Sequence, residues 1–138
     1  MLRNYWLVGA MWGGTEDTLP AFITRGYWYC WDIANSTNEL SSSGNSVATQ
    51  RARFAQVKEG DRIAVKKVAS ITAQEMEIRA LGIVKTIDLE EWRIYVDWLP
   101  IALGTNEIKR YVELKGCTAS IHGPFDNSNP WINQIFSI

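Results

Sequence analysis

The distribution of apolar positions along the chain predicts short strands interrupted by short helices. Apolar runs and alternating apolar and polar residues are typical of strands, and glycine, serine or asparagine clusters mark their ends. These signals occur at residues 4–9, 27–32, 62–66, 76–84, 92–98, 111–114 and 118–121. We expect roughly five or six strands from these segments.

Helical spacing of apolar residues predicts two helices and a last amphipathic turn. The first helix begins at Asp17 or Thr18 and ends before Gly26, a residue suited to the left-handed position after a helix. The second covers residues 47–57, with Gly60 marking its end and an alanine stripe facing the core. That stripe consists of Ala48, Ala52 and Ala55. Asn129-Pro130 opens the last turn.

The order of these elements predicts the fold class. It lacks the regular strand–helix alternation of a doubly wound sheet. We therefore expect an α+β fold: a small, curved, mixed or antiparallel β-barrel flanked by two or three short helices. Residues 1–138 carry no internal repeat or linker and form one predicted domain. The serine- and asparagine-rich residues 35–45 are predicted to form a surface loop.

Composition excludes several classes of protein. Hydrophobic residues make up 46% and charged residues 21% of the 138 residues, values typical of globular domains. No apolar run approaches the ~20 residues of a membrane span, and the N-terminus lacks a signal-peptide pattern, so we expect a cytoplasmic protein. Cys30 and Cys117 are isolated and are expected to be reduced. With one histidine they form a poor metal-ligand set, so neither a metal nor a cofactor is expected.

The charges are unevenly distributed although the net charge is only −1. Residues 51–67 contain six basic and two acidic residues, a local net charge of +4. A local basic stripe on a nearly neutral protein is typical of a binder that touches a few phosphates while recognising another group. A solvated helix face explains the same charges equally well.

Seven tryptophans are more than a core of this size requires. We expect Trp6 and Trp92 to fill the core. Trp12 stands beside a glycine pair and is predicted to line a pocket, since indole rings bind flat or cationic groups.

The chain resembles the EVE-like domains of the PUA superfamily, and most closely the N-terminal modified-DNA-binding module of McrB-type restriction proteins. The motifs that carry the resemblance are Tyr5-Trp6-Leu7-Val8-Gly9, Trp12-Gly13-Gly14-x-Glu16-Asp17, Phe22-Ile23, Gly26-x-Trp28, Val57-Lys58-Glu59-Gly60-Asp61-Arg62-Ile63-Ala64-Val65-Lys66, Ile78-x-Ala80-Leu81-Gly82-Ile83-Val84 and Val96-Asp97-Trp98. They cover nearly the whole chain in the expected order.

The resemblance implies a non-catalytic module that binds DNA or RNA by accepting a flipped-out, modified base, with methylation the expected modification. The implied base pocket comprises Trp12, Gly13, Gly14, Asp17, Trp28, Asp97 and Trp98. The implied phosphate contacts are Arg51, Arg53, Arg62 and Lys66. Asp17 is equally suited to cap a helix, while Trp28 and Trp98 are equally suited to the core.

Two departures from the family are visible. The lysine-serine-glutamate-proline turn of many EVE domains is replaced by Ala10-Met11-Trp12-Gly13-Gly14, and no Walker-type loop is present. A role in restriction would therefore require a separate nuclease or NTPase chain.

Two other functions remain open. ASCH-type hydrolases of modified nucleosides, in the same superfamily, use a lysine, a threonine and a glutamate, for which Lys66 or Lys67, Thr72 and Glu75 are the counterparts. A thiol nucleophile built from Cys30 and His122 is disfavoured, because Cys30 lies among aromatics and His122 precedes a Gly-Pro turn. The aromatics could instead form a protein–protein interface.

Overall fold

The computed structural model describes residues 3–12, 16–41, 44–68, 74–101, 103 and 108–137. The strands are β1 (Tyr5–Gly9), β2 (Met11–Trp12), β3 (Glu16–Asp17), β4 (Tyr27–Tyr29), β5 (Arg62–Val68), β6 (Glu75–Asp88), β7 (Arg93–Trp98), β8 (Arg110–Glu113) and β9 (Ile121–Phe125). The helices are α1 (Leu19–Arg25), α2 (Trp31–Asn35), α3 (Val47–Phe54) and α4 (Pro130–Phe136). The class is therefore α+β, as predicted.

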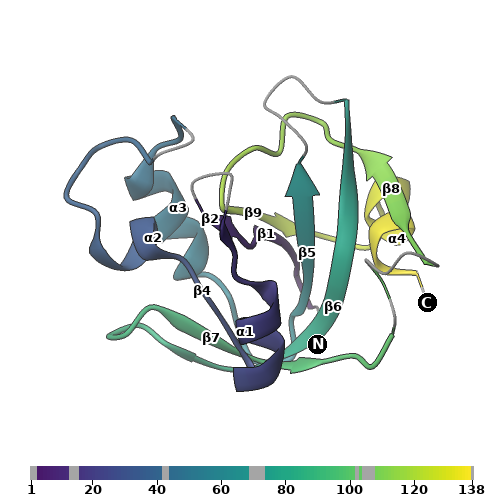
Figure 1. Ribbon diagram of the computed structural model, residues 1–138, viewed down its shortest axis with the longest axis horizontal. Helices are drawn as coiled ribbons and strands as arrows, with labels where there is room; N and C mark the ends of the chain where they lie inside the picture. Colours follow the sequence, from purple (N-terminus) through teal and green to yellow (C-terminus); the bar gives the residue numbers. More distant parts are fainter. Residues whose placement is uncertain are drawn as a thin grey trace.

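Seven of these strands form one curved sheet in the order β4-β7-β6-β5-β1-β9, with β8 pairing to β6 beside this path (Figure 1). Of the described pairs in this sheet, β1 and β5 run parallel and the others are antiparallel. Among the described strands no pairing joins β4 to β9, so the sheet is open and the expected closed barrel is not confirmed.

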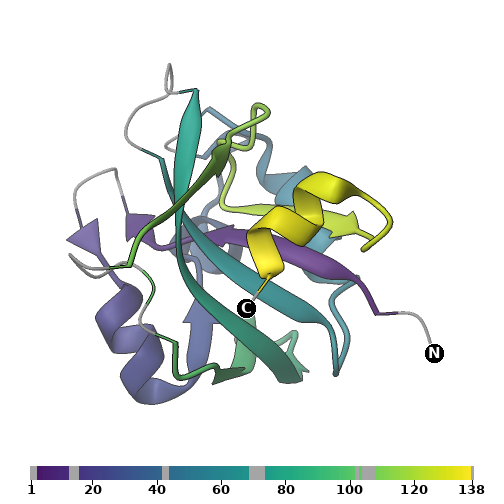
Figure 2. The ribbon, with the colours of Figure 1, turned by 90° about the vertical axis from the view of Figure 1, so that its right-hand side faces the viewer.

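The sheet separates two hydrophobic cores. In β1, Trp6 and Val8 face a core completed by α1, α2 and α3, while Leu7 faces a second core completed by α4. This follows from the two-residue period of a strand. Figure 2 shows α4 lying across the face of β1 and β5, on the side away from α2 and α3. Trp6 is fully buried, as expected, and its indole nitrogen donates to Asp61 at 2.9 Å.

Several predicted elements are confirmed. Gly26 has a positive φ of 73° and its N–H donates to the carbonyl of Phe22, so it ends α1 as predicted. The side chain of Asn129 accepts a hydrogen bond from the N–H of Trp131 and so caps α4.

The second predicted helix differs in extent and orientation. It ends at Phe54 and not at residue 57, and its buried face consists of Val47, Gln50 and Phe54. The predicted alanine stripe is exposed. Phe54 provides far more apolar area than an alanine, which explains why it and not the stripe faces the core.

Three short segments also differ from the predictions. The strand expected over residues 27–32 ends at Tyr29, and Trp31 begins a helix. The strand expected over residues 118–121 begins only at Ile121. His122 lies within that strand and not in a turn, because the strand continues to Phe125 through Gly123 and Pro124. Trp92 is half-buried in the turn before β7 and packs at the edge of the first core.

Candidate ligand-binding site at the end of strand β1

The carboxyl ends of the two parallel strands bring together the most unusual polar groups of the molecule. Gly9 ends β1 and pairs with Lys66 of β5. The chain then turns into β2, which carries Trp12. Three residues span at most about 11 Å, so the Cα atoms of Trp12 and Gly9 lie within that distance. Trp12 and Lys66 therefore belong to the same end of the sheet.

Trp12 is half-buried against other aromatic rings. Its ring centroid lies 5.7 Å from that of Tyr29 and 6.5 Å from that of Phe22. Its indole N–H is buried and has no hydrogen-bond partner in the described part of the chain. Buried indole N–H groups are normally paired, because leaving a donor unsatisfied costs about 1–3 kcal/mol. Trp12 thus combines a ring that can stack with a donor that lacks an acceptor.

Lys66 was predicted to contact phosphate from the surface, but only 5% of it is exposed. Its ammonium faces Gly9, where a side chain would place its Cβ atom 3.6 Å from Nζ. No carboxylate of the described residues lies within ion-pair distance of it. Burial lowers the pKa of Lys66 to about 8, against the opposing effect of the Cys117 and Cys30 thiols. This is an ammonium held out of water without an anion.

The surroundings of Lys66 add no negative charge. Burial, together with Lys66 and Arg53, lowers the pKa of His122 to about 3, so its imidazole is neutral at pH 7. The Nε2 atom of His122 accepts from the N–H of Ala119 at 2.8 Å, which assigns the ring proton to Nδ1. Burial also raises the pKa of the Cys117 thiol. The site is therefore positive and rich in donors.

The two predicted phosphate contacts on α3 are engaged inside the protein. Arg51 donates from Nε to the carbonyl of Ile33 and from Nη2 to that of Ser36, both at 2.8 Å, and so ties the end of α2 to α3. Arg53 donates to the carbonyl of Ile121 at 2.8 Å. Both side chains are half-buried. Neither the phosphate prediction nor the solvated-face alternative describes these roles.

Asp17 lies one residue before Thr18, which occupies the N-cap position of α1, so the helix-cap alternative is not met as predicted. The Oδ1 atom of Asp17 accepts from the N–H of Leu19 at the start of α1. Both carboxylate oxygens also accept from Arg79 of β6, at 2.9 and 2.8 Å. The Arg79 hydrogen bonds lower the pKa of Asp17, so it stays ionised. Since Trp12 pairs with Glu16 beside it, this bidentate pair fixes the β2–β3 ribbon to the main sheet.

The other predicted pocket residues are divided between the core and the surface. Trp28 is fully buried and its indole donates to the carbonyl of Gly9, so it offers no surface to a ligand. Trp98 is half-buried and donates to the carbonyl of Phe22 at 3.0 Å. Asp97 is exposed and lies 3.7 Å from Lys85. Of this predicted set, Trp12 and Asp17 remain together near the end of β1.

Arg62 lies elsewhere, beside α4. Gly13, Gly14 and Thr72 lie outside the described residues. Tyr29 and Arg93 were not predicted to be site residues. Both belong to the aromatic wall, the group of aromatic rings and the guanidinium stacked on them beside Trp12. The guanidinium of Arg93 lies 5.8 Å from the Tyr29 ring centroid and 5.2 Å from that of Tyr27. The tyrosines flanking Trp28 were the only sequence signal for this wall.

Lys66 and Glu75, two of the residues considered for catalysis, lie apart. Lys66 pairs with Ile78, and Ile78 lies three residues from Glu75 along β6. The Cα atoms of Lys66 and Glu75 are therefore separated by about 10 Å along the strands. Glu75 is also exposed whereas Lys66 is buried. Cys30, the thiol considered as a nucleophile, is buried, with only 5% of it exposed, and lies in the first hydrophobic core.

No helix within the described residues is long and apolar enough to span a membrane. The same residues contain no group of three or more histidine, cysteine or acidic side chains placed to hold a metal ion.

The comparisons with known proteins complete the description. No family model, no curated protein and no solved structure matches the chain.

Proposed function

We propose that the protein is a non-catalytic nucleic-acid-binding module that holds a flipped-out, modified base at the end of β1. The observation that carries the proposal is the buried indole N–H of Trp12, which lacks an acceptor among the described residues while its ring packs in an aromatic wall. A nucleobase can stack on the Trp12 ring with its π-face, and the ring or carbonyl acceptors on its edge can accept the hydrogen bond of the indole N–H. Stacking on an aromatic ring contributes about 1–3 kcal/mol per base.

Lys66 supports the same assignment. An unpaired buried ammonium is unfavourable unless a ligand neutralises it or accepts its hydrogen bonds. A nucleotide carries acceptors on its base and a negative charge on its phosphate, so it suits a site with the unsatisfied indole donor of Trp12 and the buried ammonium of Lys66. A purely apolar partner would leave the Trp12 donor buried and unpaired. For this reason the adaptor function is less well supported.

The exposed apolar residues point the same way. The largest of them are Ile23, Trp31, Leu40, Leu89, Ile108 and Tyr111. They come from α1, α2, the loop before α3, the β6–β7 turn and the β8 segment. Such scattered residues are normal on a surface and do not indicate a docking interface.

The resemblance to EVE-like domains is consistent with this proposal and extends it to a methylated base within a PUA-like barrel. The aromatic wall would accommodate a methyl group, whose discrimination is worth about 1–3 kcal/mol. If the module serves restriction, a separate nuclease or NTPase chain cleaves the nucleic acid.

The proposal is tested by fluorescence anisotropy with short labelled DNA and RNA. The panel contains unmodified strands and strands with N6-methyladenine, 5-methylcytosine or 5-hydroxymethylcytosine. We expect tighter binding to one modified strand and a loss of about tenfold or more in Trp12→Ala. Trp31→Ala is the matched control, since Trp31 is 52% exposed on α2, and it should bind normally. Equal affinities across the panel, or equal losses in the two variants, would overturn the proposal.

A further inference from the structure

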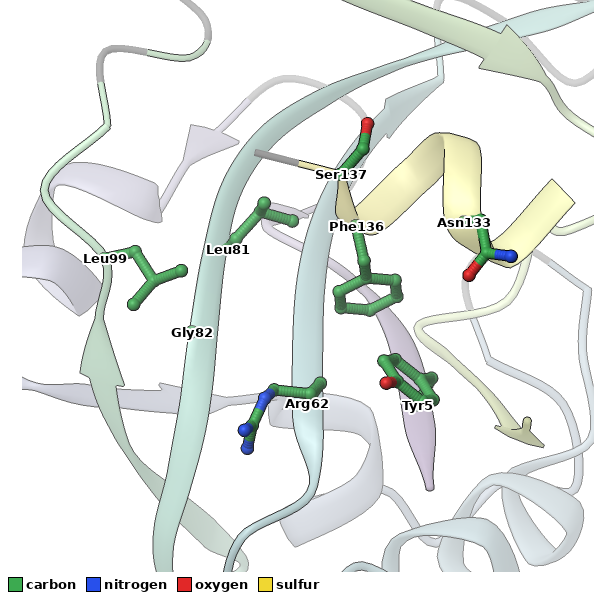
Figure 3. Close-up of a pocket in the computed structure, with 8 residues that line it drawn as sticks. All are labelled: Tyr5, Arg62, Leu81, Gly82, Leu99, Asn133, Phe136 and Ser137. Atoms are coloured by element: carbon green, nitrogen blue, oxygen red, sulfur yellow. The ribbon is translucent and has the colours of Figure 1, made fainter. Parts of the chain in front are cut away.

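A cavity lies on the α4 side of the sheet, between α4 and strands β1, β5 and β6 (Figure 3). Its volume is about 270 Å³. This is larger than the ~150 Å³ that encloses a benzene ring and close to the lower limit of small-molecule pockets, ~300 Å³. The proposed function does not use it.

The walls of this cavity are mainly apolar. Figure 3 shows Leu81 and Leu99 on one side and the rings of Phe136 and Tyr5 on the other. The two rings meet edge to face, with centroids 4.9 Å apart and planes inclined at 70°. This fixed geometry gives the cavity a firm aromatic wall, suited to an apolar ligand body about one ring wide.

One cation stands at the cavity, and it lacks an anion. Arg62 donates from Nη1 to the carbonyl of Gly60 at 2.6 Å, which anchors the guanidinium. No carboxylate of the described residues is within ion-pair distance of it. Its neighbour Asp61 is turned away and accepts instead from Trp6, Asn4 and Lys58. The other N–H groups of Arg62 therefore remain available.

We propose that this cavity binds a small carboxylate with a flat or branched apolar body. A guanidinium matches the two oxygens of a carboxylate in a bidentate arrangement. The apolar body lies between the leucines and the aromatic pair. A single cation among apolar walls suits a monoanion, whereas a phosphate ester would require more donors.

The test uses 3-phenylpropionate, titrated into the isotopically labelled protein and followed by two-dimensional NMR. Its neutral amide, 3-phenylpropanamide, has the same shape and is the matched control ligand. We expect saturable shifts of the Leu81, Leu99 and Phe136 signals with the acid, with Kd below about 1 mM. The amide should bind about tenfold more weakly, because it lacks the charge-assisted hydrogen bonds. Equal affinities, or shifts confined to other residues, would overturn the proposal.

Variants separate this site from the first one. Arg62→Gln should weaken binding of the acid about tenfold and leave the amide unchanged, whereas the exposed Arg25→Gln should change neither. Leu99→Phe should reduce binding of both ligands by filling the cavity. Trp12→Ala should bind 3-phenylpropionate normally, so failure of either proposal leaves the other intact. If Arg62→Gln does not fold, the comparison of acid and amide on the native protein decides the question.

Discussion

At the residue scale, the buried charge of Lys66 opposes folding. Lys66 is almost fully buried without an ion pair among the described residues. The ordinary pKa of a lysine is 10.5 and burial lowers that of Lys66 to about 8. The unfolded chain therefore binds more protons than the folded protein between these two values, and stability rises with pH across that range.

We expect Lys66→Met to stabilise the free protein. At pH 7 the lysine is charged in both states, and the full cost of its burial, on the order of 3 kcal/mol, opposes folding. Methionine has a similar length and no charge. Urea unfolding at pH 7 should show the variant more stable than the wild type by about 2–3 kcal/mol, with the difference shrinking between pH 8 and 10.5. A pH-independent difference would contradict this account.

The same variant sharpens the functional test. A more stable protein that has lost nucleic-acid affinity cannot owe the loss to unfolding. We expect Lys66→Met to bind the preferred strand about tenfold more weakly, because it removes one charge-assisted contact. Anisotropy measured together with the unfolding curve checks both effects. Unchanged affinity would remove Lys66 from the site while leaving Trp12 in it.

Asp61 shows the opposite case, a buried charge that is fully satisfied. Its carboxylate accepts from the Trp6 indole, the N–H of Lys58 and the N–H of Asn4. Asp61→Asn replaces an accepting oxygen with a donating amide, and we expect a loss of about 1–3 kcal/mol in urea unfolding. Asp88→Asn is the control, because Asp88 accepts two backbone N–H groups in an exposed turn. Similar losses in both would show that burial is not the cause.

Aromatic positions were easier to predict than charged ones. The compact apolar run of β1 predicts from local sequence alone that Trp6 lies in the core, and the structure confirms it. The roles of Arg51 and Arg53 depend on the carbonyls of Ile33, Ser36 and Ile121. Long side chains reach partners far away in sequence, so spacing along a helix could not indicate them.

At the element scale, the contact between β6 and β7 depends on a glycine. Gly82 pairs with Trp98 across the strands, and a Cβ atom there would overlap the side chain of Val96 and lie 3.0 Å from Trp98. The two strands can approach closely only because position 82 has no side chain. Packing explains the glycine at this position without reference to a ligand.

We expect Gly82→Ala to lower the free energy of unfolding by about 2–3 kcal/mol through overpacking. Val96→Ala removes the overlapping methyl groups, so the double variant should recover about 1–2 kcal/mol relative to the sum of the single variants. A double-mutant cycle by urea unfolding measures this coupling. Strictly additive losses would show that the strands separate instead of repacking.

Element prediction succeeded where local chemistry determines the boundary. Gly26 and Asn129 end and begin helices through their own backbone and side-chain properties. It failed at α2, where Trp31 continues an aromatic run typical of a strand. Arg51 holds the end of that short helix from α3, a tertiary contact that five residues of sequence do not contain.

At the scale of the whole molecule, the strand order is the feature least accessible from sequence. Strand β1 pairs with β5 and β9, which lie more than fifty and more than one hundred residues further along the chain. The apolar pattern predicted β1 and β5 with their approximate bounds and placed the last strand at residues 118–121, but it carried no information about the neighbours of any strand. The candidate site at the end of β1 depends on this pairing, since it brings Lys66 against Gly9.

The charge of the whole molecule leads to the last prediction. The net charge is −1, Lys66 is buried, and Arg51 and Arg53 bind carbonyls within the protein. Few cations of the predicted phosphate-binding set therefore remain for a nucleic-acid backbone. Each neutralised phosphate contributes about −0.9 to the slope of log K against log salt for duplex DNA. We expect a slope shallower than about −3, with the preference for the modified base preserved between 50 and 200 mM salt. Anisotropy titrations across this range measure both quantities. A steep slope with the preference lost at higher salt would mean that the protein binds the backbone, and the base would then have no part in its affinity.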